Sequence, residues 1–303
     1  MLETERLMLI ASPLMTRTPV FDRAAALAKA TNSALHIVAF DYVEGLVTAG
    51  LVNERALAEM REGYLVRHRE WLAEQAKAMH HLGIEVTSEV IWVLRPLDEI
   101  LAHIQEMHPS MVIKELAHES WLARALFSSL DMRLLHDCPV PLHLVVSAEH
   151  GIARKILAAV DPFRPEEHFE QLNDQIIACA EKLAAQCDAD LHLLYAYDFS
   201  SLYAAQGNFG LSGSRAKTLY EEQGQAFEQL ADRFGVPPER RHLIMGAAPK
   251  VIDAFARAEA IDIIVMGTVH RKLLNKLMGS TTEQVAYHMP SSLLTVIARN
   301  PSE

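Results

Sequence analysis

The 303-residue chain has few cysteines, a deficit of positive charge and no long apolar run. Its three cysteines are odd in number and lack metal-binding spacing, which is typical of a reducing compartment. The 28 lysines and arginines against 39 aspartates and glutamates argue against a nucleic-acid footprint or an anionic membrane surface. No apolar run approaches the roughly 18 residues of a membrane span, and residues 1–6 are acidic where a signal peptide is basic. We therefore expect a cytoplasmic protein with neither nucleic-acid nor membrane partners.

The chain carries one sequence pattern twice. Residues 34–42 (ALHIVAFDY) return as residues 190–199 (DLHLLYAYDF). Each copy follows an apolar strand that ends near a proline and precedes a helix begun by a proline, Pro96 or Pro249. A repeat of this length corresponds to a whole domain rather than to a solenoid unit. The sequence therefore predicts two domains, residues 1–150 and 151–303, with a short junction around Gly151.

Each half alternates short apolar segments with longer helical patterns. Helices are predicted at 53–82 and 215–234, where apolar residues recur every three or four positions and a glycine follows. The β-α order, repeated twice, predicts two tandem doubly wound α/β domains, each a five-stranded parallel sheet flanked by helices. The expected strands are 6–11, 34–41, 85–91, 111–114 and 142–147 in the first half, and 155–160, 190–197, 242–245, 262–266 and 293–298 in the second.

Such sheets bind ligands beyond the carboxyl ends of the strands, where the strand order reverses. In the second half, Asp161 follows the first strand and Gly267 follows the fourth, where a bare backbone would admit a ligand. Residues 279–282 (GSTT) then offer hydroxyls and free N–H groups at a helix start, which suits phosphate. Each feature also has a simpler explanation, an N-cap and a turn. Their joint occurrence leaves the structural and the ligand-binding interpretations both open.

These residues resemble the universal stress protein family. Its nucleotide-binding members carry an aspartate after the first strand and the pattern Gly-x2-Gly-x9-Gly-(Ser/Thr), for which this chain supplies Asp161, Gly267, Gly279 and Ser280. The resemblance covers both halves and matches the tandem form of the family. It implies an adenine nucleotide alpha hydrolase-like fold and a cytoplasmic stress-response role. It also implies ATP or AMP as ligand, with Mg²⁺ as a compatible companion.

The resemblance assigns residues to the two ends of the nucleotide. The sequence departs from the family pattern at His270, which replaces the second glycine. Eight residues, instead of the nine in the pattern, separate His270 from Gly279. Its imidazole could donate to the phosphates or occupy their space. The expected adenosine contacts are Ala159, Val160, Asp161 and Ala196, and the expected phosphate-end contacts are Met266, Gly267, His270, Gly279, Ser280 and Thr281.

The first half has lost these groups. Ser12 stands in the place of Asp161, Lys114 in that of Gly267, and residues 128–129 (SS) in that of 279–280. Lys114 is expected to meet Glu115 or Asp131 and to close a purely structural copy of the site. The alternative is an anion site built from Lys114, His118, Ser128 and Ser129.

Three classes of function follow. The first is a non-catalytic stress protein that binds a nucleotide, and the second is a slow ATPase or autophosphorylating enzyme using Ser280 or Thr281. The third is a binder of another small or apolar ligand beside the leucine-rich segment 273–278. The sequence contains no Gly-x-Ser-x-Gly nucleophile elbow, and no pair of carboxylates near Gly267 that could bind Mg²⁺. Both absences argue against catalysis. The non-catalytic protein is the main expectation.

Metal and partners complete the expectations. The fifteen histidines include no His-x3-His with a third ligand, so no structural metal is expected. His36 and His192 occupy identical repeat positions, which indicates a shared packing role. The last strands, 142–147 and 293–298, are each a sheet edge that needs cover and could pair within one chain. A pseudo-dimer of the halves is therefore expected, compatible with a homodimer and with an unknown protein partner.

Overall fold

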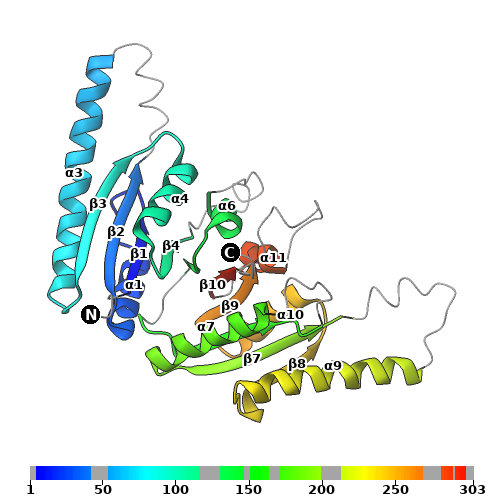
Figure 1. Cartoon of the computed structure of the whole chain (residues 1–303). Helices are drawn as coiled ribbons and strands as arrows, with labels where there is room; N and C mark the ends of the chain where they lie inside the picture. The colour runs from blue at the N-terminus through cyan, green and yellow to red at the C-terminus, as the bar shows by residue number, and fades with distance from the viewer. Residues whose placement is uncertain are drawn as a thin grey trace. The chain divides into compact units, whose positions relative to one another are not determined.

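The computed structural model describes residues 5–41, 54–116, 130–146, 151–163, 171–198, 213–268, 281–288 and 291–297. The chain divides into two compact units, Met1–Ile152 and Ala153–Glu303, and each is a complete fold of its own (Figure 1).

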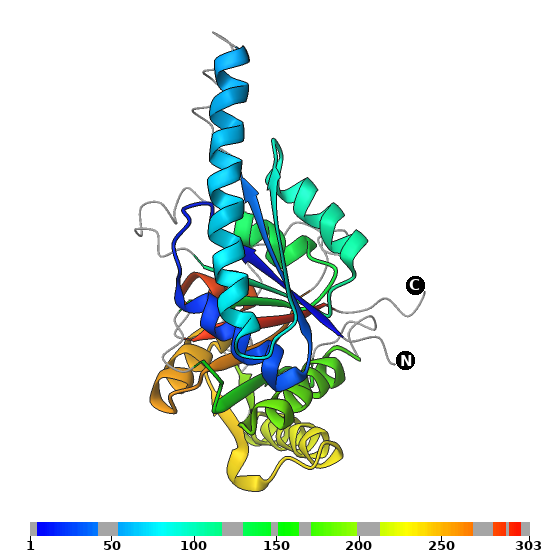
Figure 2. The same cartoon turned by 90° about the vertical axis from the view of Figure 1, so that its left-hand side faces the viewer.

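The first unit is a parallel sheet with strand order β3-β2-β1-β4-β5. Every residue of β2 is buried, as expected for a strand covered by helices on both faces. Figure 2 shows the long helix α3 running beside β3. The elements are β1 (Arg6–Ala11), α1 (Pro19–Thr31), β2 (Ala34–Asp41), α3 (Glu54–His80), β3 (Val86–Trp92), α4 (Pro96–Met107), β4 (Met111–Glu115), α6 (Leu130–Asp137) and β5 (Leu142–Val145).

The second unit repeats this arrangement, with strand order β8-β7-β6-β9-β10 and parallel pairing throughout. The order in which the chain adds strands therefore reverses between β6 and β9, in the middle of the unit. Its elements are β6 (Lys155–Val160), α7 (Leu172–Cys187), β7 (Asp190–Tyr197), α9 (Gly213–Arg233), the short 3₁₀ helix η2 (Pro238–Arg240), β8 (Arg241–Met245), α10 (Ala248–Ala258), β9 (Ile263–Thr268), α11 (Thr281–His288) and β10 (Ser292–Ile297).

The repeat extends to how the first helix of each unit ends. Helix α1 stops at Asn32 (φ 51°) and α7 at Asp188 (φ 54°), both in the left-handed conformation that asparagine and aspartate tolerate best after glycine. Each cap N–H donates to a carbonyl four residues earlier, that of Ala28 or Ala184. The chain can then enter β2 or β7 within two residues.

The predicted fold class is confirmed: each unit is a doubly wound α/β domain with a five-stranded parallel sheet. One strand boundary matters for the site. Strand β9 was expected to end at Met266 but continues to Thr268, because Gly267 and Thr268 still pair with Val296 and Ile297 of β10. Gly267 thus lies inside the sheet rather than beyond it. Ser147 and Ala298, the expected ends of the last strands, lie outside the described residues.

One turn in the second unit requires glycine. Gly246 follows β8 with φ at +148°, a region that side chains rarely adopt. A Cβ built there would lie 2.8 Å from Cγ2 of Val251 in α10. Both the backbone and the packing of α10 therefore select glycine at this position.

The three cysteines are free thiols, with Cys138 and Cys187 buried and Cys179 half-buried. Burial raises the pKa of both Cys138 and Cys179 to about 11, which keeps these thiols protonated and unreactive at neutral pH. None of the helices that the structure describes has the length and apolarity needed to cross a membrane.

Candidate functional site

The second unit contains a cavity of about 100 Å³ at the carboxyl ends of its central strands. Strands β6 and β9 are neighbours, and the chain leaves them toward opposite edges of the sheet, which makes this the topological switch point. The predicted site residues in its wall come from β6 and the turn after it, β7, β9 and α11: Ala159, Val160, Asp161, Ala196, Met266, Gly267 and Thr281.

Every predicted site residue that the structure describes therefore lines this one cavity. His270, Gly279 and Ser280 lie outside the described residues. The two roles considered for His270, phosphate donor or obstruction, stay predictions.

Sequence reasoning missed the helical side of the cavity. The additional lining residues are Leu172, Asn173 and Ile176 of α7, Leu194 of β7, Ala248 and Ile252 of α10, and Thr282 of α11. The spacing of Leu172 and Ile176, four residues apart, marks an apolar helix face. That signal places the face against the sheet but does not say which strand end it covers.

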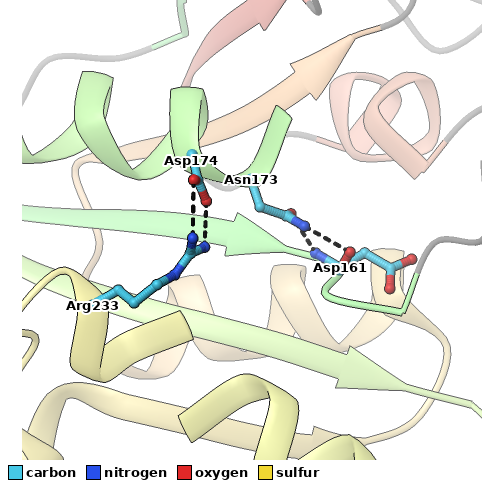
Figure 3. Close-up of polar contacts among 4 residues, drawn as sticks. All are labelled: Asp161, Asn173, Asp174 and Arg233. Atoms are coloured by element: carbon cyan, nitrogen blue, oxygen red, sulfur yellow. Dashed lines mark hydrogen bonds and ion pairs between the residues drawn. The ribbon is translucent and has the colours of Figure 1, made fainter. Parts of the chain in front are cut away.

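The turn that carries Asp161 is held by Asn173. The Asp161 N–H donates to Asn173 Oδ1 at 3.0 Å, and Asn173 Nδ2 donates to the Asp161 carbonyl at 2.9 Å (Figure 3). On the other side, the Asp161 carboxylate accepts from the N–H of Phe163 at 3.1 Å, an Asx turn. The carboxylate is thus oriented by its own turn while remaining exposed to solvent.

The start of α7 is also tied to α9. Arg233 donates through both terminal nitrogens to the carboxylate of Asp174, at 2.6 and 3.3 Å (Figure 3). A two-pronged contact of this kind has well-defined geometry, but both side chains are substantially exposed, so we assign it no more than about 1 kcal/mol. Its role is to position the first turn of α7, where the cavity residues Leu172 and Asn173 lie.

Gly267 is packed against a leucine. A Cβ at this position would lie 2.6 Å from Cδ2 and 2.8 Å from Cγ of Leu172, so any larger residue would force the Leu172 side chain to move. The Gly267 carbonyl accepts from the hydroxyl of Thr282 at 2.8 Å. Gly267 lines the cavity while the Leu172 side chain packs against it, so the expected contact between the Gly267 backbone and a ligand stays a prediction.

The sequence model of the universal stress protein family matches this chain twice, over residues 9–146 and 153–296. The chain belongs to the universal stress protein family. The family resemblance drawn from Asp161, Gly267 and Gly279 is therefore confirmed.

Curated relatives share the tandem length. The chain is 27% identical over 264 residues to universal stress protein E of Escherichia coli (strain K12), covering 85% of this chain and 82% of that protein. It is 23% identical over 296 residues to universal stress protein E of Photorhabdus laumondii, covering 96% and 94%.

Two solved structures share the fold over nearly the whole chain. One is a functionally unknown protein from Pseudomonas aeruginosa PAO1, with a TM-score of 0.72 and 22% identity, covering 98% of this chain and 93% of that one. The other is a universal stress protein from Archaeoglobus fulgidus, with a TM-score of 0.65 and 17% identity, covering 98% and 97%. At these identities the likeness shows the fold alone.

In the first universal stress protein unit, Lys114 meets an acid. The expectation that this lysine stands in the place of Gly267 is wrong, because the pairing of the central strands aligns Glu115 with Gly267 and Lys114 with Met266. Lys114 Nζ lies 2.7 Å from Asp131 Oδ1 and donates to the main-chain carbonyl of Glu115 at 2.9 Å. The predicted contact with Asp131 is confirmed, whereas Glu115 contributes its backbone. His118, Ser128 and Ser129, the other members of the alternative anion site, lie outside the described residues.

The wall of the cavity carries one acidic side chain. Among the lining residues that the structure describes, Asp161 is the one charged side chain. Burial raises the pKa of Tyr195, and the nearby Asp161 charge raises it further, so this phenol stays neutral at physiological pH. The described part of the cavity thus offers hydrogen-bond acceptors and apolar surface, which suit the nucleoside end of a ligand better than its phosphates.

Two histidines pack together elsewhere in the second unit. His192 Nδ1 and His242 Nε2 are 3.0 Å apart, and their rings stack at 5.3 Å between centroids. Burial is the main cause that lowers the pKa of each, so the pair is favoured as neutral imidazoles. The charged groups that act on the pair are Lys155 and Arg240, which lower the pKa of His192, and Asp190 and Glu259, which oppose that shift.

Proposed function

We propose that this universal stress protein binds an adenine nucleotide, ATP or AMP, in the cavity of the second unit, and that it serves a cytoplasmic stress response without catalytic turnover. One observation carries the proposal. Residues that the family pattern assigns to the nucleotide, scattered between Ala159 and Thr281, line a single cavity at the switch point of the sheet.

The proposed pose follows the chemistry of the walls. Ala159 and Ala196 present small side chains that leave room for a flat ring, and Asp161 accepts from a ribose hydroxyl or an adenine N–H. The phosphates point toward the start of α11, where Thr281 lies and where a helix N-terminus favours negative charge. His270, Gly279 and Ser280 complete the phosphate end, and Mg²⁺ could accompany a triphosphate.

The cavity must open for this ligand. Its volume of about 100 Å³ is small beside the roughly 300–1,000 Å³ of most ligand sites. We infer that Leu172, which lines the cavity and packs against Gly267, is the side chain that limits its volume. Nucleotide binding therefore selects a state in which Leu172 has turned away from β9.

The same leucine supports a second candidate, a small apolar ligand. The described walls include Leu172, Ile176, Leu194, Ile252 and Met266. An apolar molecule could replace the contacts of Leu172 without needing any phosphate contact. Such a ligand would remain bound during purification because its burial removes apolar surface from water.

Mass spectrometry of the undialysed full-length protein under native conditions separates the two candidates, because it weighs the retained ligand directly. Calorimetry with ATP and AMP should then give one site per chain, since the first unit has Ser12 and Glu115 in the places of Asp161 and Gly267. We expect Asp161→Ala to weaken binding by about tenfold, equivalent to one hydrogen bond of about 1.4 kcal/mol. Glu181→Ala, which removes an exposed carboxylate of α7 that is not among the residues lining the cavity, is the matched control. Two equivalent sites, or full affinity in Asp161→Ala, would refute the proposal.

We also infer that the last strands β5 and β10 pair within one chain, because each ends its own five-stranded sheet and an uncovered edge invites pairing. The two units, expressed separately and mixed, should then associate in sedimentation experiments. Stable, soluble monomers of each unit that do not combine would contradict this pseudo-dimer.

A further inference from the structure

Three potential metal ligands meet in the first unit, away from the nucleotide-pattern residues. His36 Nε2 lies 3.4 Å from His103 Nε2 and 3.8 Å from Glu89 Oε2, and His103 Nε2 lies 3.9 Å from the same carboxylate oxygen. These three atoms are mutually close enough to coordinate one ion. It is the one group of at least three such ligands within the described part of the chain.

The fold brings these ligands together from three elements. His36 lies on β2, and Glu89 lies on β3 opposite Val38, two residues further along β2 and therefore on the same face of the sheet. His103 comes from α4, which packs over β2. The ring of Phe40 meets the His103 ring edge to face at 5.6 Å and supports its orientation.

The inner histidine is prepared to act as a ligand. His36 is buried, and its Nδ1 lies 2.8 Å from the hydroxyl of Thr87. When Nδ1 carries the proton and donates to Thr87, the lone pair of Nε2 faces His103 and Glu89, as in metal sites whose histidines are fixed by an outer hydrogen bond. Burial first, and then His103 and Arg6, lower the pKa of His36 to about 4. The imidazole is therefore neutral at physiological pH, the form that binds metals.

The second unit provides an internal comparison. His192 corresponds to His36, and His242 pairs with Leu194 just as Glu89 pairs with Val38. Counted from the proline that begins each helix, Ala256 takes the place of His103. Without a third ligand, the two imidazoles of this unit contact each other directly at 3.0 Å. The first unit instead holds its two imidazoles further apart, with a carboxylate beside both.

We propose that His36, Glu89 and His103 form a mononuclear zinc site in the first unit. Two imidazoles and one carboxylate are a known Zn²⁺ ligand set that leaves the fourth position open. Zinc bonds of about 2.0–2.1 Å at tetrahedral angles place neighbouring ligand atoms about 3.3 Å apart. The observed 3.4–3.9 Å needs only a small inward movement of Glu89.

The open position of this zinc site faces solvent. The Glu89 side chain is 49% exposed, whereas that of His103 is 12% exposed and that of His36 is 7% exposed. A water or an external ligand can therefore complete the coordination from the side of Glu89. Imidazole nitrogens select zinc over Mg²⁺ and Ca²⁺, which prefer oxygen ligands. The ion would also fasten α4 to β2 and β3.

The test uses the full chain, stripped of metal by a chelator and titrated with Zn²⁺ in a calorimeter. We expect one tight site per chain, and Co²⁺ in its place should give the visible absorption of a tetrahedral ion. His103→Ala and Glu89→Gln should each weaken zinc binding by about 100-fold or more, and Thr87→Val by about tenfold. Glu89→Gln alters a half-exposed side chain with an isosteric amide, so the fold is preserved.

His242→Ala is the matched control, because it removes a histidine at the equivalent position of the second unit. It should leave zinc affinity and stoichiometry unchanged. Unchanged zinc affinity in His103→Ala and Glu89→Gln would overturn the proposal. So would a titration that shows only weak zinc binding, as expected for exposed histidines, and no tight site. Tighter binding of Fe²⁺ than of Zn²⁺, in anaerobic competition, would overturn the choice of metal. These results are independent of nucleotide binding in the second unit.

Discussion

Replacing Leu172 with alanine should make the second unit less stable and its nucleotide binding tighter. Leu172 is 6% exposed, packs against Gly267 and lines the cavity, and we infer that its side chain limits the space for a ligand. Alanine at this helix position removes the atoms that cover the Gly267 backbone while keeping a good helix former. The two effects have opposite signs, which distinguishes this change from simple damage to the fold.

The size of each effect follows from the packing. Buried leucine-to-alanine changes cost about 2–5 kcal/mol, and we expect about 2–3 kcal/mol here because the new space joins an existing cavity that water can enter. A domain of this size should lose roughly 5–10 °C in melting temperature. If nucleotide binding exposes about half of the Leu172 side chain to water, that exposure costs about 1.4 kcal/mol. The alanine variant does not have this cost, so its affinity for the nucleotide should be about tenfold higher.

Calorimetry with AMP, together with thermal unfolding, measures both quantities on the same protein. Leu183→Ala is the control, since Leu183 is equally buried on α7 but is not among the residues that line the cavity. It should lower the melting temperature by a similar amount and leave affinity unchanged. Unchanged or weaker AMP binding in Leu172→Ala would refute the view that this leucine obstructs the site. Higher affinity of Leu172→Ala for an apolar ligand, with no change in its affinity for AMP, would favour the second candidate function.

Three further predictions concern stability. Gly246→Ala should lower the free energy of unfolding by about 1–3 kcal/mol in urea titrations, because the turn needs a positive φ and lacks room for a Cβ, and a neutral result would show that the turn relaxes. Lys114→Met should cost about 3 kcal/mol by leaving the buried Asp131 carboxylate unpaired, with partial recovery in the double variant with Asp131→Asn. The lowered pKa values of His192 and His242 mean that the unfolded chain binds more protons below about pH 6.5. Stability should therefore decrease as the pH falls through the reference histidine pKa of about 6.5, and less steeply when both are glutamine.

The two copies of the domain have diverged in complementary ways. The second unit keeps Asp161 and Gly267, whereas the first has Ser12 and Glu115 at these positions, and the neighbouring Lys114 is paired to Asp131. The proposed zinc ligands show the opposite distribution, because Ala256 stands in the second unit where His103 stands in the first. Under the two proposals, each unit has kept or acquired one kind of site on a shared scaffold.

Local sequence determined most of the fold. Strands β1, β2, β6 and β7 have the predicted boundaries, because each is a continuous apolar segment ended by a turn residue and repeated in both halves. Asn32 and Asp188 end the preceding helices through their own backbone preference, which requires no tertiary contact. Together with the family pattern, the strand ends also identified the strand side of the cavity.

Only the tertiary structure decided what occupies and surrounds these positions. Pairing with β10 extends β9 through Gly267, and the docking of α7 places Leu172 on that glycine, although nothing in the spacing of these residues indicates the contact. His36, Glu89 and His103 form no motif either, so the sequence alone led us to expect no metal. They meet because strand register and helix docking determine which side chains share a face of the sheet, and both depend on packing between segments distant in the chain.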